Sequence, residues 1–312
     1  MVWRHNRIGF FFLLVFLLLP TKKSVGVDYT LPYLQTGNSP EFFLSKQSFS
    51  PSALATYEND AGGTWRKKNT ISIFRTAIYD ELTYSGIAAS LQRNRTRFIL
   101  AHAMFGKENI PKTAINDELN DSPFFKTGQQ YGYQNSHSKF VIQNDLSESI
   151  RLAYSINLYH TKIDSISDTK GNLSVGFMSQ SKNFDFGISL QNLFPVSMRL
   201  PSNEKIPTLV IISTRLKPRS WVQLSPRAIF IRSSVNKSRN VLFSSGLHIY
   251  PLHFLSIDIA TYEQFSGEAP KASLAFGTSL TLSNSISISY VYRDTEFQEK
   301  KESHLIGFSF QF

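Results

Sequence analysis

The sequence predicts an all-β protein: a transmembrane antiparallel up-and-down β-barrel of about 14 strands, with an N-terminal inward segment. Three observations lead to this prediction. Apolar and polar residues alternate along most of residues 68–312, long and short connections alternate between these runs, and the chain is aromatic, with 26 Phe and 13 Tyr among its 312 residues. Transmembrane barrels have this composition because one face of each strand meets lipid and the other meets the lumen.

The alternation has the period of a β-strand. Between positions 150 and 158, the even positions hold Ile, Leu, Tyr, Ile and Leu, whereas the odd positions hold Arg, Ala, Ser and Asn. Such a period of two gives a strand one apolar and one polar face. Fourteen runs of this kind are predicted as strands, near residues 68–78, 84–92, 96–105, 130–144, 149–161, 171–180, 183–191, 206–216, 220–233, 240–250, 253–262, 271–282, 284–294 and 302–312.

The connections between these runs alternate in length. The long ones fall at residues 106–129, 162–170, 192–205, 263–270 and 295–301, and those at 79–83 and 234–239 are intermediate. Links of one to four residues lie between them. Outer-membrane barrels have short periplasmic turns and longer external loops. The pattern therefore favours such a barrel over a soluble β-sandwich, and an even strand count places both ends of the barrel on the periplasmic side.

The N-terminus has the layout of an export signal. Arg4 and Arg7 precede an unbroken apolar run at residues 8–19, which Pro20 ends, and small residues follow at 24–26. This predicts a signal peptide over residues 1–26, with the mature chain starting near Val27. The alternative is an uncleaved anchor, although the run is short for a membrane-spanning helix of about 20 residues.

Residues 27–67 differ from the rest of the chain because they contain prolines and lack sustained alternation. We therefore divide the chain into a signal peptide at 1–26, a plug-like segment at 27–67 and a barrel at 68–312. Small side chains on the predicted inner face leave room for such a plug. Phe42, Phe43 and Leu54 are its expected packing residues.

Three stretches stand out: SPSALA at 50–55, FDFGISLQNL at 184–193, and the closing pair SISISYVYRD and ESHLIGFSFQF at 285–294 and 302–312. They resemble the outer-membrane barrels related to the long-chain fatty-acid transporter FadL, especially their PorV/PorQ-type relatives. The PorP/SprF-type proteins of type IX secretion share this general appearance. Ser50 stands where the FadL-related family has Asn, and PEFF at 40–43 replaces the glycine-rich run of that family. The resemblance implies that the box at 50–55 lies inside the barrel.

The final strand ends in alternating aromatic residues, Phe308, Phe310 and Phe312. A terminal aromatic on an amphipathic strand resembles the signal by which the barrel assembly machinery recognises its clients. The alternative is an ordinary strand that happens to end in Phe. We expect outer-membrane lipid and the assembly machinery as partners, and the cell outer membrane as the location.

The sequence carries little sign of catalysis or metal binding. There is no cysteine, no HExxH pair, no GxSxG elbow and no phosphate-binding glycine motif. We therefore predict no enzyme activity and no cofactor. Asp117, Glu118 and Asp121 could offer oxygen ligands to Ca²⁺, but a solvated loop is the simpler interpretation. The net charge of +10 is spread along the chain, so no nucleic-acid partner is expected.

Four charged residues fall on the polar faces of predicted strands: Arg151, Asp185, Asp258 and Arg293. Charges that line a lumen set selectivity or hold a plug. Cross-strand ion pairing within the wall is the alternative. Two functions follow from the resemblance. The first is a scaffold or shuttle component of a type IX-like protein secretion system, with other secretion proteins as partners. The second is a FadL-like transporter of hydrophobic small molecules.

Overall fold

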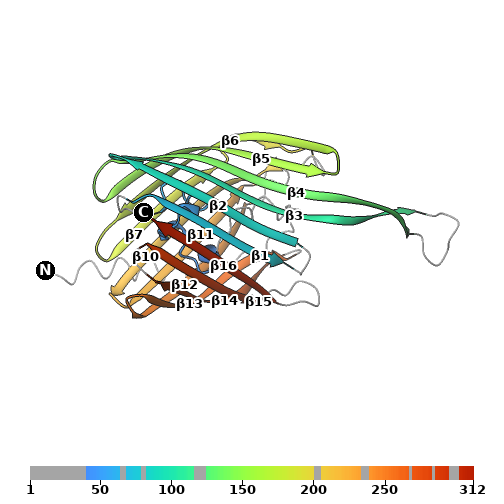
Figure 1. The fold of residues 1–312 in the computed structure, drawn as a ribbon. Coiled ribbons are helices and arrows are strands. Elements are labelled where there is room, and N and C mark those ends of the chain that lie inside the picture. The colour runs from blue at the N-terminus through green and yellow to red at the C-terminus, as the bar shows by residue number, and fades with distance from the viewer. Residues whose placement is uncertain are drawn as a thin grey trace.

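The computed structural model describes residues 40–63, 68–78, 82–115, 124–199, 205–232, 239–266, 269–282, 285–294 and 302–312. These residues form a closed barrel of antiparallel strands, shown in Figure 1, and confirm the predicted fold class. The fourteen strands of the barrel are β1 (Thr70–Ile78), β2 (Leu82–Arg93), β3 (Thr96–Ile115), β4 (Phe124–Asp145), β5 (Ile150–Ile163), β6 (Ile166–Gln180), β7 (Phe184–Gln191), β10 (Thr208–Arg219), β11 (Val222–Arg232), β12 (Arg239–Leu252), β13 (Leu255–Ser266), β14 (Ala269–Thr281), β15 (Ile286–Asp294) and β16 (Glu302–Gln311).

Each strand pairs with its neighbours in the sequence, and β7 pairs with β10. The first and last strands close the barrel, in a register that runs from Thr70 opposite Gln311 to Ala77 opposite His304. Beyond this ladder, the backbones of Asn69 and Phe312 exchange two hydrogen bonds of 3.0 Å. Closure matters because an open strand edge would leave backbone groups without partners in lipid.

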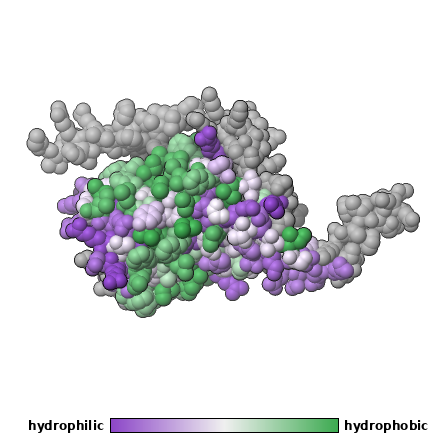
Figure 2. All heavy atoms as spheres, turned by 90° about the horizontal axis from the view of Figure 1, so that it is seen from above, coloured by the Kyte–Doolittle hydropathy of each residue, from purple (hydrophilic) through white to green (hydrophobic). Residues whose placement is uncertain are grey.

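The two faces of a strand have opposite exposure, as β5 shows. Leu152, Tyr154, Ile156 and Leu158 on its outer face are 43–51% exposed. The side chains between them point inward and are at most 4% exposed. Figure 2 shows hydrophobic residues gathered on the outside of the barrel, with hydrophilic residues toward its ends. An apolar outer band with a polar interior is the arrangement of a barrel that faces lipid.

Three of the predicted long loops, at 106–129, 162–170 and 263–270, consist mostly of strand in the described residues. Residues 106–115 and 124–129, expected in a loop, extend β3 and β4 into a two-stranded ribbon that reaches well past the neighbouring strands (Figure 1). The last pair between β4 and β5 is Tyr133 with Ile163, so among the described residues no third strand joins the ribbon beyond that level. The predicted loop at 162–170 is instead a tight turn, in which Asp164 has a φ of 55°.

The connections as a whole partly follow the prediction. The loop expected at 192–205 contains a small ribbon of β8 (Val196–Ser197) and β9 (Lys205–Ile206). The loop expected at 263–270 is mostly strand, because β13 runs to Ser266 and β14 begins at Ala269. The opposite end of the barrel has short turns, as predicted, at residues 94–95, 220–221 and 253–254; the last two follow the expected positions 217–219 and 251–252, which are strand. Residues 79–81, 233–238 and 295–301 lie outside the described residues, as does the predicted signal peptide.

Residues 40–63, which we call the inner segment, lie within the barrel (Figure 1). They form three short helices: α3 (Pro40–Phe43), η1 (Gln47–Phe49) and η2 (Ala53–Tyr57). None of the helices in the described part of the chain is long and apolar enough to cross a membrane. The side chains and backbone of the inner segment contact inward-facing residues of the wall, and this interface is the candidate site.

Candidate functional site: the interface between the inner segment and the wall

The inner segment is a compact chain with its own local hydrogen bonds. Ser52 caps η2, because its Oγ accepts a hydrogen bond from the Leu54 N–H at 3.1 Å. A tight turn follows the helix, where the Asn59 side chain accepts from the Ala61 N–H at 2.9 Å. Gly63 has a φ of 105°, which favours glycine. These local interactions make the segment compact, so that residues of the wall can contact it from several sides.

Glu58 is the centre of a buried charge network. Its Oε2 lies 3.0 Å from Nη1 of Arg227 on β11, and neither side chain is more than 3% exposed. Its Oε1 accepts from the Ser48 hydroxyl at 2.7 Å and from the Ser213 hydroxyl of β10 at 3.2 Å. A buried carboxylate is tolerated only when it is paired and hydrogen bonded, and Glu58 meets both conditions.

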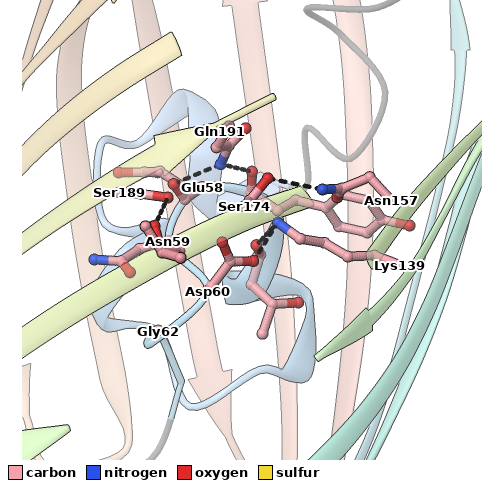
Figure 3. A network of polar contacts seen from close by, with 12 residues as sticks. Glu58, Asn59, Asp60, Gly62, Lys139, Asn157, Ser174, Ser189 and Gln191 are labelled. Carbon is pink, nitrogen blue, oxygen red and sulfur yellow. Dashed lines mark hydrogen bonds and ion pairs between the residues drawn. The ribbon is translucent and has the colours of Figure 1, made fainter. Parts of the chain in front are cut away.

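A second ion pair joins the segment to β4, as Figure 3 shows. Lys139 Nζ lies 2.6 Å from Asp60 Oδ1, and both side chains are fully buried. The same ammonium donates to the backbone carbonyl of Thr56 at 2.6 Å. On the same strand, the Gln143 amide donates to the carbonyls of Asp60 and Gly62. One strand of the wall therefore binds the segment through both charge and backbone.

The β6 and β7 strands hold the turn after η2 by close approach. The Asn59 amide donates to the Phe177 carbonyl at 3.1 Å, and Gln191 Nε2 donates to the carbonyls of Tyr57 and Glu58 (Figure 3). Gly176 and Gly187 make room for Asn59, since a Cβ at either position would lie 2.5–2.6 Å from its side-chain amide. These glycines are needed because any larger residue would displace the segment.

Aromatic rings of the inner segment meet arginines of the wall. Arg227 lies over the ring of Phe42 at 4.1 Å, Arg293 over Phe43 at 4.3 Å, and Arg215 over Phe49 at 5.0 Å. Cation–π contacts of this kind are worth more when they are removed from water. The hydroxyl of Tyr57 also donates to the His137 carbonyl at 2.8 Å, and burial raises the pKa of Tyr57 well above its usual value, so it stays neutral.

The four predicted lumen charges all lie on the inner face, at most 6% exposed. Asp258 pairs with Lys46 of the inner segment at 2.7 Å, and Arg293 stacks on Phe43. Arg151 pairs instead with Asp145 at 2.5 Å, and Asp185 with Arg215 and Lys217, within the wall. Asp258 and Arg293 thus contact the inner segment, whereas Arg151 and Asp185 form ion pairs between residues of the wall.

Asp258 also belongs to a chain of side chains that the sequence did not indicate. His248 Nδ1 lies 2.9 Å from Asp258 Oδ1, and His248 Nε2 lies 3.0 Å from the Ser225 hydroxyl. This order matches the relay of a serine hydrolase. However, Ser225 and His248 are both 0% exposed, so the hydroxyl cannot reach a substrate. The arrangement fits a structural role, in which His248 orients the carboxylate that binds Lys46.

The expected packing residues of the plug also lie at this interface. Phe43 and Leu54 are 5% and 2% exposed. Phe42 packs with Phe43 against the wall, whereas Leu54 belongs to a separate cluster. Sequence reasoning missed Glu58, Asp60, Lys139 and Arg227. The alternation along β4 could have identified Lys139, which shares the inner face of the strand with Asn135, His137 and Gln143.

The remaining predicted sites divide into two groups. Phe308, Phe310 and Phe312 are 44–60% exposed, on the outer face of the last strand and its end. Asp117, Glu118 and Asp121 lie outside the described residues, within which no cluster of three or more His, Asp or Glu side chains could hold a metal ion.

The closed barrel, its apolar outer face and its filled interior define a β-barrel membrane protein of the outer-membrane type. Residues 112–312 match the family described as the type IX secretion system membrane protein PorP/SprF. Because this match spans more than half of the sequence, the chain belongs to the PorP/SprF family. The sequence had favoured the PorV/PorQ type over PorP/SprF, and the family that is found corrects that preference.

Solved structures of similar fold come from hydrocarbon transporters. The toluene transporter TbuX of Ralstonia pickettii has a TM-score of 0.63 at 10% identity, and the similarity covers 89% of this chain and 99% of that one. For the toluene transporter TodX of Pseudomonas putida the values are 0.62 and 9%, with 85% and 96% covered. At such low identity, the likeness concerns the fold alone. No curated protein matches the sequence.

Proposed function

We propose that this protein is a scaffold or shuttle component of a type IX protein secretion system in the outer membrane. The observation that carries the proposal is the inner segment, which is bound on all sides of the lumen. It contacts Ser72 on β1, Lys139 on β4, Arg227 on β11 and Asp258 on β13, among others. The family match supports a role in secretion.

The size of the barrel makes this filling significant. Barrels of eight strands are filled by their own side chains, whereas those of 16–18 strands leave a water channel. A barrel of fourteen strands lies between these limits and has space for an insert. Here the insert is held by buried ion pairs, as at Glu58 and Asp60. Such a barrel serves better as a support for partners than as an open pore.

The ribbon of β3 and β4 is the surface that we assign to a secretion partner. Beyond the pair Lys107–Tyr133 it stands clear of β2 and β5, and the pairing continues to Ile115 opposite Phe124. A ribbon of two strands is marginally stable by itself in water. Its edge backbone groups can accept a further strand from a partner, which would stabilise it.

The ribbon can be tested separately from the barrel. Joining Lys107 to Tyr133 through an Asn-Gly turn should remove the ribbon and keep the β4–β5 ladder intact. In the native bacterium we expect normal amounts of folded barrel, judged by heat-modifiable gel mobility, and loss of type IX cargo from the medium. As a control, joining Glu263 to Ala272 by the same turn shortens a different hairpin at the same end. Normal secretion without the ribbon would refute this assignment.

The second candidate function is transport of a hydrophobic small molecule. The fold likeness to proteins described as toluene transporters favours it. This function would require a path past the inner segment. Saturable binding of toluene by the purified protein would support transport, and the absence of saturable binding would support the scaffold.

Further parts of the proposal concern export and organisation. Residues 1–26 act as a signal peptide, residues 27–67 as a plug-like unit and residues 68–312 as the barrel. Membrane lipid contacts the outer face, and the assembly machinery reads the aromatic end of β16. No enzymatic step is assigned to the protein.

A further inference from the structure

A cavity of about 200 Å³ lies between the inner segment and the wall, near the short-turn end of the barrel. The turn residues His253 and Phe254 form part of its lining, as do Lys46 and Pro51 of the inner segment. In an outer-membrane barrel the short turns face the periplasm. The cavity is therefore placed to receive a solute or a chemical group from that side.

The lining is rich in hydroxyl groups. Five serines and one threonine from four strands contribute to it: Ser256, Ser279, Thr281, Ser287, Ser289 and Ser309. Ser256 and Ser279 already donate, to Asp258 and Ser289, and Ser309 bonds with Ser72. Thr281 and Ser287 are therefore the hydroxyl donors that we assign to an anion, since a hydroxyl both donates and accepts. Ser279 already accepts a hydrogen bond from the Lys46 ammonium at 3.2 Å, which places the hydroxyl row beside a cation.

Two ion pairs at the cavity are oriented with the cation toward the space. The side chains of Lys46 and Arg215 line the cavity and are 13% and 16% exposed. Their carboxylate partners, Asp258 and Asp185, are 0% exposed and lie behind them. Lys217 also pairs with Asp185 at 2.7 Å, so two cations share this one carboxylate. The cavity wall thus presents positive charge and hydroxyl donors.

We propose that this cavity binds a small oxyanion, a phosphate or carboxylate group, on a solute from the short-turn side. The Lys46 ammonium and the Arg215 guanidinium supply charge, and the Thr281 and Ser287 hydroxyls supply hydrogen bonds. The volume suits such a group with a short attachment, since about 10–15 Å³ of cavity space holds one water molecule. This proposal does not depend on the proposed secretion role, because binding is measured with the purified protein and the ligand alone.

The test is calorimetric titration of the full-length protein in octyl glucoside, a detergent without phosphate. Inorganic phosphate and acetate are titrated at constant ionic strength, with chloride as the comparison anion. We expect saturable binding of at least one oxyanion, about tenfold or more tighter than that of chloride, because hydrogen-bond geometry adds to charge. Absence of saturable binding, or equal affinity for chloride, would overturn the proposal.

Variants locate the binding. Ser287→Asp places a negative charge on the cavity wall and leaves both ion pairs in place. It should weaken oxyanion binding by about tenfold or more, because like charges a few ångströms apart repel strongly near a protein surface. Ser220→Asp adds the same charge at an exposed turn outside the cavity lining and should leave affinity unchanged. If Ser287→Asp fails to fold, Thr281→Asp repeats the test. Equal effects at the cavity and at position 220 would refute the location.

Discussion

Lys139 Nζ on β4 lies 2.6 Å from Asp60 Oδ1 of the inner segment, and both side chains are fully buried. The two residues are far apart in the sequence, so this pair forms only when the segment enters the barrel. Buried charges in such a pair depend on each other, because each would be left without compensation if the other were removed. The pair is therefore a direct probe of whether the inner segment is docked.

Replacing Lys139 by Met should strongly weaken the docking. Removal of one partner from a buried ion pair costs about 3–5 kcal/mol, because the remaining carboxylate stays buried. We expect faster hydrogen exchange in residues 53–63 and a lower urea midpoint. The double variant Lys139→Met with Asp60→Leu should recover most of the loss, because no buried charge remains. Equal losses in the single and double variants would show that charge compensation is unimportant here.

A single methyl group on β6 should also displace the inner segment. In Gly176→Ala the new Cβ would lie 2.5 Å from Asn59 Oδ1 and 2.7 Å from the Ala61 nitrogen. Such overpacking typically costs about 1–3 kcal/mol. Gly171→Ala, on the same strand, meets its nearest atom at 3.7 Å and is the matched control. Urea unfolding of the two variants compares them, and a similar midpoint for both would contradict the close packing at Gly176.

The strands were predictable where lipid and lumen require apolar and polar residues to alternate. Lipid on one face and a packed lumen on the other force alternation, so the sequence located all fourteen barrel strands. The ribbon at 106–115 was missed because it stands beyond the wall, where neither face needs to be apolar. Within it even Pro111 is paired, opposite Gln130. The tight turn at Asp164 was missed because its positive φ falls on a residue other than glycine.

The candidate site was predictable only in part. The prolines and the missing alternation of residues 27–67 suggested an insert. The alternation of polar and apolar residues along the strands placed Asp258 and Arg293 on the inner face. The partners of these residues depend on how an irregular segment folds, and no period in the sequence encodes that fold. The pairing of Glu58 with Arg227, across 169 positions, follows from the closure of the barrel.

The ring of Phe312 should matter for assembly rather than for stability. The residue is 60% exposed, while its backbone exchanges two hydrogen bonds with Asn69. Phe312→Ala keeps those backbone bonds and removes only the aromatic group, so it is a cleaner test than truncation. We expect lower outer-membrane levels at unchanged synthesis, measured by fractionation. Phe276→Ala is the control, since it removes a ring that is 45% exposed on the outer face of β14, away from the last strand. An unchanged membrane yield of Phe312→Ala would make the terminal ring incidental.

Neighbouring positions on β15 should respond differently to the same charge. Ile288 lies on the outer face of β15, whereas Ser287 lines the cavity on the inner face. A basic residue on the lipid face costs about 2–4 kcal/mol near the bilayer midplane, and an acidic one costs less. Ile288→Asp should therefore impair insertion into vesicles, while Ser287→Asp should assemble. Heat-modifiable mobility reports folding, and equal impairment at both positions would refute the assignment of faces.

The inner segment should keep the barrel closed to ions. In a planar bilayer we expect little conductance from the intact protein, because Glu58, Asp60 and the aromatic residues tie the segment to opposite sides of the wall. Deletion of residues 40–60 should produce open conductance steps if the barrel still assembles.

A disulfide between the segment and the wall gives a second test, since the Ser48 and Ser213 hydroxyls lie 2.8 Å apart and the chain has no cysteine. Urea that loosens the segment should raise conductance in the native chain.

With S48C and S213C joined by a disulfide, the same urea should leave the barrel closed until a reductant is added. The reduced form of this variant is its own control, because it has the same residues without the cross-link. A wide and steady pore in the intact protein, or in the oxidised variant, would show that ions pass beside the docked segment. An open porin would then describe this barrel better than a closed scaffold.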